Sequence, residues 1–135
     1  MIVDTSVWIE FLRPGASEVG NRLEAMIRNG DRIVVPETVM MELLSGPTDE
    51  AVASRRRQML EAFEVEPFVP LGDSLRAAGL QRSCRRAGDT VRNLGDYLIA
   101  AVAIRLELPV MHRDRDFEVI AAHSSLQTVP LLDRS

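Results

Sequence analysis

Residues 1–11 read MIVDTSVWIEF. The apolar run of residues 1–3 predicts a short buried strand, which ends at the carboxylate of Asp4. Apolar residues then recur at helical spacing, which places the turn and the N-cap of a helix at Thr5 and Ser6. Open α/β sheets bind ligands at the carboxyl ends of their strands, and Asp4 lies at such an end. This segment therefore predicts an α/β fold and a first candidate site residue.

The length and composition indicate one globular domain. With 135 residues and 46% hydrophobic content, the chain is long enough to bury a core, and we expect a single domain over residues 1–135. No apolar stretch reaches the roughly 18 residues of a membrane span, and the N-terminus lacks the features of a signal peptide. The single Cys84 forms no intrachain disulfide, which fits a cytoplasmic protein.

The charged residues limit the possible partners. All 16 basic residues are arginine, a choice that suits phosphate contacts but that codon bias explains equally well. The net charge of −4 argues against non-specific binding of nucleic acid through bulk charge. It leaves room for a nucleic-acid enzyme whose acidic residues are held by a metal ion.

Short β-branched segments alternate with amphipathic segments along the chain. This alternation predicts a parallel sheet with right-handed crossovers. The expected strands are residues 1–3, 32–35, 64–67, 108–111 and 126–129, and the expected helices are residues 7–12, 16–29, 37–45, 49–62, 73–87, 94–104 and 116–122. In the helix at residues 73–87, the spacing favours an inward face formed by Leu75, Ala78, Gly79 and Cys84.

Two expected helices carry an acidic residue in apolar surroundings. Glu42 is the lone acid of an almost wholly apolar helix, where it requires a cation, a metal or a water-filled pocket unless it is the single solvent-facing position. Asp96 stands in the first turn of a helix that is apolar on every face, with Asn93 as its cap. The alternative for Asp96 is that it only offsets the helix dipole.

A second strand also ends in acids. Asp114 and Asp116 follow the strand at residues 108–111, and the carboxyl ends of parallel strands share one edge of a sheet. Together with Asp4, Glu42 and Asp96 they would form a pocket whose carboxylates cannot all stay ionised without compensating charge. One or two Mg²⁺ or Mn²⁺ ions would supply that charge. No Cys/His cluster supports zinc, and His112 is expected to pack beside the strand end rather than to act as a base.

Four motifs in order resemble those of a known family. They are Ile2-Val3-Asp4-Thr5-Ser6, Met41-Glu42-Leu43, Asp96-Tyr97-Leu98-Ile99-Ala100-Ala101 and His112-Arg113-Asp114-Arg115-Asp116-Phe117. This pattern resembles the PIN-domain ribonucleases and, over nearly the whole chain, the VapC toxins of toxin–antitoxin pairs. The resemblance implies a three-layer α/β domain with a short-stranded, mainly parallel sheet. It also implies a metal-dependent endoribonuclease that cleaves structured RNA such as tRNA or rRNA.

The resemblance also assigns roles to individual residues. It makes Asp4, Asp96 and Asp116 metal ligands, Glu42 a ligand or water-orienting residue, and Asp114 a ligand or a supporting residue. Thr5 or Ser6 would hydrogen-bond a metal-bound water or the scissile phosphate. Arg92, Arg113 and Arg115 would hold RNA phosphates, with a solvated surface position as the alternative for each. The expected partners are a second copy of the chain and a cognate VapB-like antitoxin.

Three other functions compete with this interpretation. A catalytically silent PIN-like domain that only binds RNA or protein is the main alternative, although the intact set of acids speaks against it. A phosphoacceptor receiver domain requires a lysine, and this chain has none. A phosphatase with Asp4 as nucleophile usually has a second acid two residues later, where this chain has Ser6.

Overall fold

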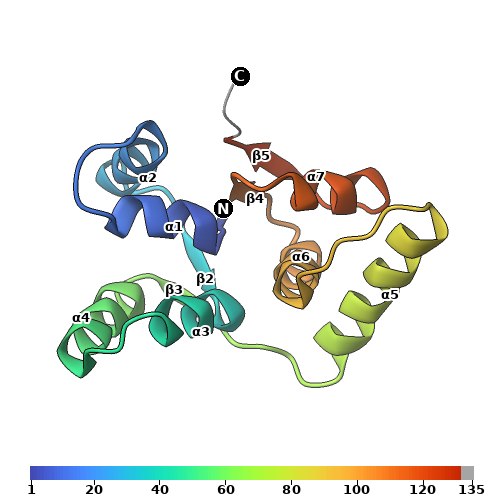
Figure 1. Cartoon of the computed structure of the whole chain (residues 1–135), viewed down its shortest axis with the longest axis horizontal. Helices are drawn as coiled ribbons and strands as arrows, with labels where there is room; N and C mark the ends of the chain where they lie inside the picture. The colour runs from blue at the N-terminus through green and yellow to red at the C-terminus, as the bar shows by residue number, and fades with distance from the viewer. Residues whose placement is uncertain (132–135) are drawn as a thin grey trace.

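The computed structural model describes residues 1–131, and its strands form one five-stranded parallel sheet in the order β3-β2-β1-β4-β5 (Figure 1). The strands are β1 (Ile2–Val3), β2 (Val34–Pro36), β3 (Glu64–Glu66), β4 (Val110–His112) and β5 (Thr128–Pro130). The helices are α1 (Thr5–Leu12), α2 (Glu18–Arg28), α3 (Glu37–Ser45), α4 (Glu50–Glu61), α5 (Gly72–Arg86), α6 (Leu94–Leu106) and α7 (Arg115–Ala122).

The strand order divides the helices into two layers. The chain steps outward from β1 to β2 and β3, then returns past β1 to β4 and β5. Because crossovers between parallel strands are right-handed, outward and returning connections lie on opposite faces of the sheet. Figure 1 shows α1 to α4 on one side and α5 to α7 on the other. The three-layer α/β fold with a parallel sheet is therefore confirmed.

Most helices begin where a polar side chain caps the first turn. Ser17, Asp49 and Asn93 each accept a hydrogen bond from a backbone N–H of the helix that follows, as N-caps do. The first helix differs from the prediction, because Asp4 is its N-cap and Thr5 already belongs to α1. Aspartate is as good an N-cap residue as serine or threonine, so the helix begins one residue earlier, directly after Asp4.

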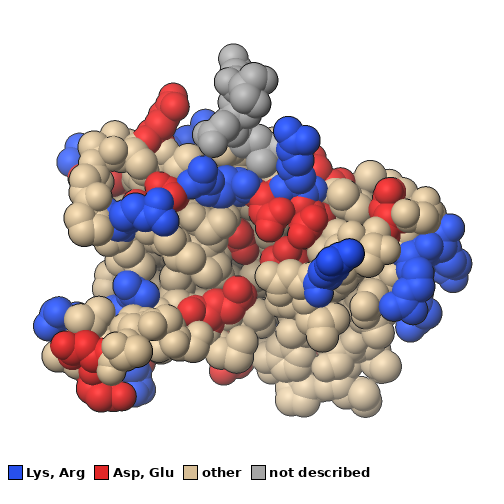
Figure 2. Space-filling view, viewed as in Figure 1, with Lys and Arg blue, Asp and Glu red and all other residues tan. Residues whose placement is uncertain are grey.

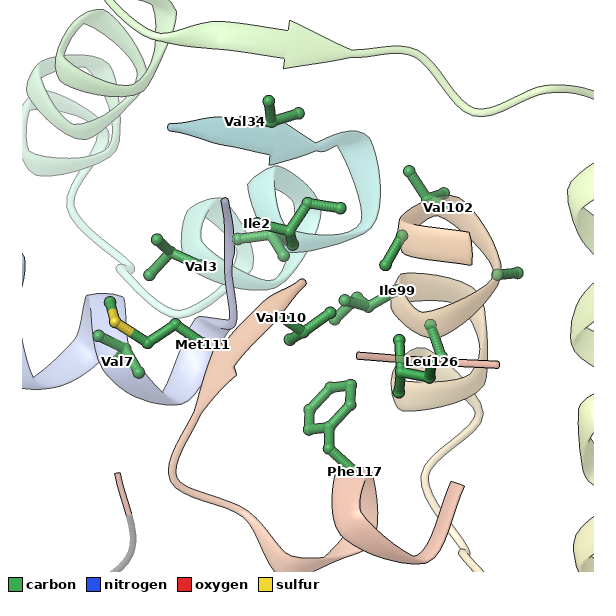
Figure 3. Close-up of a cluster of buried hydrophobic side chains, with 14 of the residues drawn as sticks. Ile2, Val3, Val7, Val34, Ile99, Val102, Val110, Met111, Phe117 and Leu126 are labelled. Carbon is green, nitrogen blue, oxygen red and sulfur yellow. The ribbon is translucent and has the colours of Figure 1, made fainter. Parts of the chain in front are cut away.

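The core lies around β1, which has neighbours on both sides. Ile2 pairs in register with Val34 on one side and with Val110 on the other, and all three side chains are fully buried. Figure 3 shows Ile2 and Val110 directed toward Ile99 and Val102 of α6. The apolar helix α6 is thus central, as its sequence predicted.

The buried face of α5 agrees with the prediction at Cys84 but not at Leu75, Ala78 and Gly79. Leu75 is 61% exposed, whereas the buried residues of this helix are Asp73, Ala77, Leu80 and Cys84. Asp73 is buried because Arg105 of α6 donates two hydrogen bonds to its carboxylate, with N–O distances of 2.9 and 3.1 Å. A spacing argument that counts aspartate as an outward residue cannot find this face.

Two further expectations concern the whole chain. Among residues 1–131, no helix combines the length and the apolar character that crossing a bilayer requires. The single domain over residues 1–135 stays a prediction, since residues 132–135 lie outside the described part of the chain.

Candidate active site

The five predicted acids meet at one edge of the sheet. Asp4 follows β1, and Glu42 lies in α3. Asp114 is the N-cap of α7, Asp116 lies in the first turn of that helix, and Asp96 lies in the first turn of α6. Asp96, Asp114 and Asp116 each offer one carboxylate oxygen, and these three oxygens lie within 4.8 Å of one another. Figure 2 shows acidic side chains gathered at the centre of this face of the molecule. The structure therefore brings together the acids whose convergence the sequence predicted.

Asp4 is held rigidly at the end of β1. Its backbone N–H donates to the carbonyl of Met111, and its Oδ2 accepts hydrogen bonds from the N–H and the hydroxyl of Ser6 at 3.1 and 2.6 Å. The Ser6 hydroxyl in turn accepts the backbone N–H of Arg113 at 3.4 Å. Burial raises the pKa of Asp4, while the bonds from Ser6 act in the opposite direction. Ser6 therefore links the two strand ends that carry the acids.

Asp96 is the most perturbed acid of the site. Its side chain is 4% exposed, and its Oδ2 has no hydrogen-bond partner within residues 1–131. Burial, followed by the negative charges of Asp4, Asp114, Asp116 and Glu42, raises the pKa of Asp96 to about 8. A carboxyl group in this state binds a proton or a cation, since its isolated charge is costly to bury.

Glu42 reaches the same cluster from α3. Burial and the charge of Asp4 raise the pKa of Glu42, and the nearby Thr5 hydroxyl lowers it. Thr5 Oγ1 and Glu42 Oε1 nevertheless form no hydrogen bond of good geometry. The α6 backbone passes close to this carboxylate, because a Cβ added at Gly95 would lie 3.3 Å from Glu42 Oε1. The Glu42 side chain therefore lies in the contact between α3 and α6, and it is not simply the solvent-facing position of its helix.

These oxygens fit a hard divalent cation. Three buried polar atoms of the site have no hydrogen-bond partner in the described structure: Thr5 Oγ1, Glu42 Oε1 and Asp96 Oδ2. Buried polar atoms are nearly always paired, so these oxygens next to the three clustered aspartates are available to a bound cation or to water. An all-oxygen donor set is the one that Mg²⁺ and Mn²⁺ prefer.

Asp114 combines two tasks. It is the N-cap of α7, where its Oδ1 accepts the N–H of Asp116 at 2.9 Å. Its own N–H donates to Nδ1 of His112 at 3.0 Å, and Nε2 of that ring lies 2.9 Å from Glu118. Burial and the charge of Asp114 raise the pKa of Asp116.

Glu118 was missed by the sequence analysis, because nothing in its spacing marks it as part of the site.

An open pocket of about 530 Å³ adjoins the acids. The pocket is lined by residues of α1 and of the segment that follows β4, namely Ser6, Ile9, Glu10, Arg113, Asp114 and Arg115. Arg113 forms an ion pair with Glu10 at 2.7 Å, so its guanidinium is held at the pocket wall. Figure 2 shows arginine side chains bordering the acidic centre. The third predicted phosphate contact, Arg92, is exposed and lies on the segment before α6.

Comparison with known proteins agrees with this geometry. The family model described as PIN domain matches residues 1–123. This chain belongs to the PIN-domain family. The VapC ribonuclease Mb1587 of Mycobacterium bovis and ribonuclease VapC11 of Mycobacterium tuberculosis (strain H37Rv) are each 36% identical to it over 131 residues, which cover 94% of this chain and 96% of theirs. It is thus a PIN domain of the VapC type.

A solved structure shares the fold of this PIN domain. VapBC2 from Rickettsia felis, crystallised with a DNA fragment from its promoter, superposes with a TM-score of 0.74 at 18% identity and covers 96% of each chain. At that identity the likeness establishes the fold alone. The resemblance drawn from the four motifs is therefore confirmed at the level of family and fold. The roles of the individual site residues stay predictions.

Proposed function

We propose that this PIN domain is a metal-dependent endoribonuclease whose catalytic centre is formed by Asp4, Glu42, Asp96, Asp114 and Asp116. The observation that carries the proposal is the convergence of these carboxylates, with the pKa of Asp96 raised to about 8 by burial and by its acidic neighbours. The identity to proteins named VapC ribonucleases supports RNA as the substrate. Structured RNA, tRNA or rRNA, is the substrate class that we propose.

The site residues divide the work between binding a cation and holding RNA. Asp96, Asp114 and Asp116 would hold the Mg²⁺ or Mn²⁺ ion, with Asp4 and Glu42 as ligands of the same ion or of a second one. Such an ion supplies an activated water and stabilises the charge on the leaving oxygen. Thr5 Oγ1 is buried and unpaired within the described structure, so it can donate to a water or a phosphate oxygen at the site.

The arginines at the pocket provide the phosphate contacts. Arg113 and Arg115 line the pocket beside Asp114, and Arg92 is exposed ahead of the α6 N-terminus. Arginine binds phosphate oxygens through two parallel N–H bonds, which orients a phosphodiester as well as attracting it. These contacts read the backbone and not the base sequence.

Cleavage of RNA tests the proposed reaction. We expect the wild type to cut total cellular RNA with Mg²⁺ or Mn²⁺, and Asp4→Ala and Asp96→Asn to lose at least about 100-fold in rate, since metal-held charge stabilises the transition state. Glu24→Gln, on the exposed surface of α2, is the control and should cut like the wild type. If both site variants cut at the wild-type rate, the proposed centre is wrong.

We also propose that the chain acts as the toxin of a toxin–antitoxin pair in the cytoplasm, as a homodimer. Solved structures with the same fold include a toxin–antitoxin complex from Klebsiella pneumoniae. A VapB-like antitoxin would lay an apolar helix on this face and insert a basic side chain among the acids. The described structure offers a surface for it, since Ile9 lines both the pocket at the acids and a second pocket with Leu12, Pro14 and Arg56.

Expression in cells tests the proposed partner. Expressing the chain alone should arrest growth, and co-expressing the small reading frame beside its gene should restore growth. Asp96→Asn should remove the arrest without the partner. Normal growth of cells that express the wild-type chain, with RNA cleavage intact in vitro, would contradict the toxin role but not the nuclease.

A further inference from the structure

His112 ends β4 and lies directly behind the acidic site. Its ring is fully buried and packs against Phe117 of α7, with ring centroids 5.0 Å apart. A buried imidazole must satisfy both of its nitrogens, because an unpaired polar atom in the interior is costly. Both nitrogens of His112 do have partners, and these partners belong to different elements.

The hydrogen bonds of His112 define its tautomer. Nδ1 accepts the backbone N–H of Asp114 at 3.0 Å, so Nδ1 carries no proton. Nε2 lies 2.9 Å from Glu118 Oε1 and therefore carries the proton, which it donates to the carboxylate. With both nitrogens engaged and no exposed surface, the ring cannot take a proton from a nucleophile at the site.

The chain of bonds continues to the edge of the sheet. The hydroxyl of Thr128 in β5 donates to the same Oε1 of Glu118 at 2.6 Å. The bonds thus run from β5 through α7 to the end of β4, and they finish at the N–H of Asp114. That turn also carries Asp116, whose N–H is bound by Asp114 Oδ1.

We propose that His112, Glu118 and Thr128 form a positioning relay that orients the Asp114 turn for metal binding. The relay rests on the proposed function, in which Asp114 helps to hold the cation. It fixes the Asp114 backbone before the ion arrives, so that the carboxylate stays close to Asp96 without being ordered by the ion. Groups that orient metal ligands in this way typically contribute about 10- to 100-fold to metal affinity.

Two substitutions of Glu118 separate its hydrogen bonds from its charge. Glu118→Gln removes the charge but keeps an Oε1 that can accept from both His112 and Thr128, while Glu118→Ala removes both. We expect Glu118→Gln to bind Mn²⁺ like the wild type and Glu118→Ala to bind it about tenfold more weakly. Thr128→Val removes only the last bond of the relay and should weaken Mn²⁺ binding about threefold.

Mn²⁺ titration calorimetry gives the affinities, and ¹⁵N NMR of the imidazole reports the tautomer. We expect the Nε2-protonated form in the wild type and in Glu118→Gln. Equal losses of Mn²⁺ affinity in the two Glu118 variants would assign the effect to charge and overturn the relay. The relay would also be overturned if Glu118→Ala and Thr128→Val had lower melting temperatures but an unchanged Mn²⁺ affinity.

The behaviour of the wild type keeps the two proposals apart. If Glu118→Ala does not fold, Thr128→Val decides the result, and unchanged Mn²⁺ affinity in that variant overturns the relay. A wild type that binds no Mn²⁺ would contradict the metal site itself, and the relay with it. A wild type that binds Mn²⁺ and is insensitive to all three changes contradicts the relay alone.

Discussion

At the scale of single residues, Asp96 couples the site to pH. Burial and neighbouring acids raise its pKa to about 8, from the 3.8 of an ordinary aspartate. Between these two values the metal-free folded state keeps the proton and the unfolded chain has lost it. The folded state then binds more protons, so the contribution of Asp96 to stability falls as the pH rises through this window.

Asp96→Asn should remove this dependence. An amide does not titrate, so the metal-free variant should lose less stability than the wild type between pH 5 and pH 8, by on the order of 10 °C in melting temperature. Thermal unfolding in the presence of a chelator measures the difference, and the other titrating groups are common to both proteins. Parallel curves for the two proteins would show that Asp96 has no raised pKa.

Gly95 tests the contact between α3 and α6. An alanine Cβ there would lie 3.0 Å from Asn93 Oδ1 and 3.3 Å from Glu42 Oε1, so one of these groups must move. We expect Gly95→Ala to lower Mn²⁺ affinity several-fold while hardly changing the melting temperature, because alanine itself favours a helix. Gly46→Ala is the matched control, since nothing lies within 4 Å of its Cβ. Equal Mn²⁺ affinities in the two variants would contradict a role for this contact.

The residues of the site differ in how visible they are in the sequence. Glu42 and Asp96 stand out because each is an acid inside an apolar helix, a placement that is costly without a purpose. Asp4 and Asp114 stand out because they follow strands. Glu118 has neither mark, since its role depends on a hydrogen bond to His112 that only the packing of α7 on β4 creates.

At the scale of elements, one arginine joins α6, α5 and β3. Arg105 binds Asp73 through two hydrogen bonds and Glu66 through a third at 2.7 Å, and it lies four-fifths buried. This explains why the bounds of α5 were predicted to within one residue while most of its inward face was not. Helix bounds depend on local sequence, but the inward face of α5 depends on a partner from another helix.

Arg105→Ala should destabilise the fold. Removing it leaves the fully buried carboxylate of Asp73 with the Val69 N–H and one ion pair to Arg76 at 3.3 Å, and we expect a loss of about 2–4 kcal/mol in the free energy of unfolding. Arg57→Ala, which removes an exposed helical ion pair with Glu61, is the control and should leave the urea midpoint unchanged. If both variants unfold at the same urea concentration, the buried pair is not a structural link.

At the scale of the whole molecule, the proposed cation site depends on folding. Its acids come from the end of β1, from α3 and α6 and from the β4–α7 turn, so a cation held by them would bind the folded chain and not the unfolded one. Saturating Mn²⁺ at about 100 times its dissociation constant should therefore stabilise the protein by about 2.7 kcal/mol, seen as a higher melting temperature that a chelator reverses. A melting temperature independent of Mn²⁺ would contradict the metal site.

The central place of β1 has a consequence for synthesis on the ribosome. β1 is the first strand made, yet one of its two neighbours, β4, is among the last. A nascent chain that still lacks β4 has an unpaired sheet edge and neither Asp114 nor Asp116. The proposed cutting centre therefore cannot assemble until β4 and the turn that follows it have been made and have joined β1.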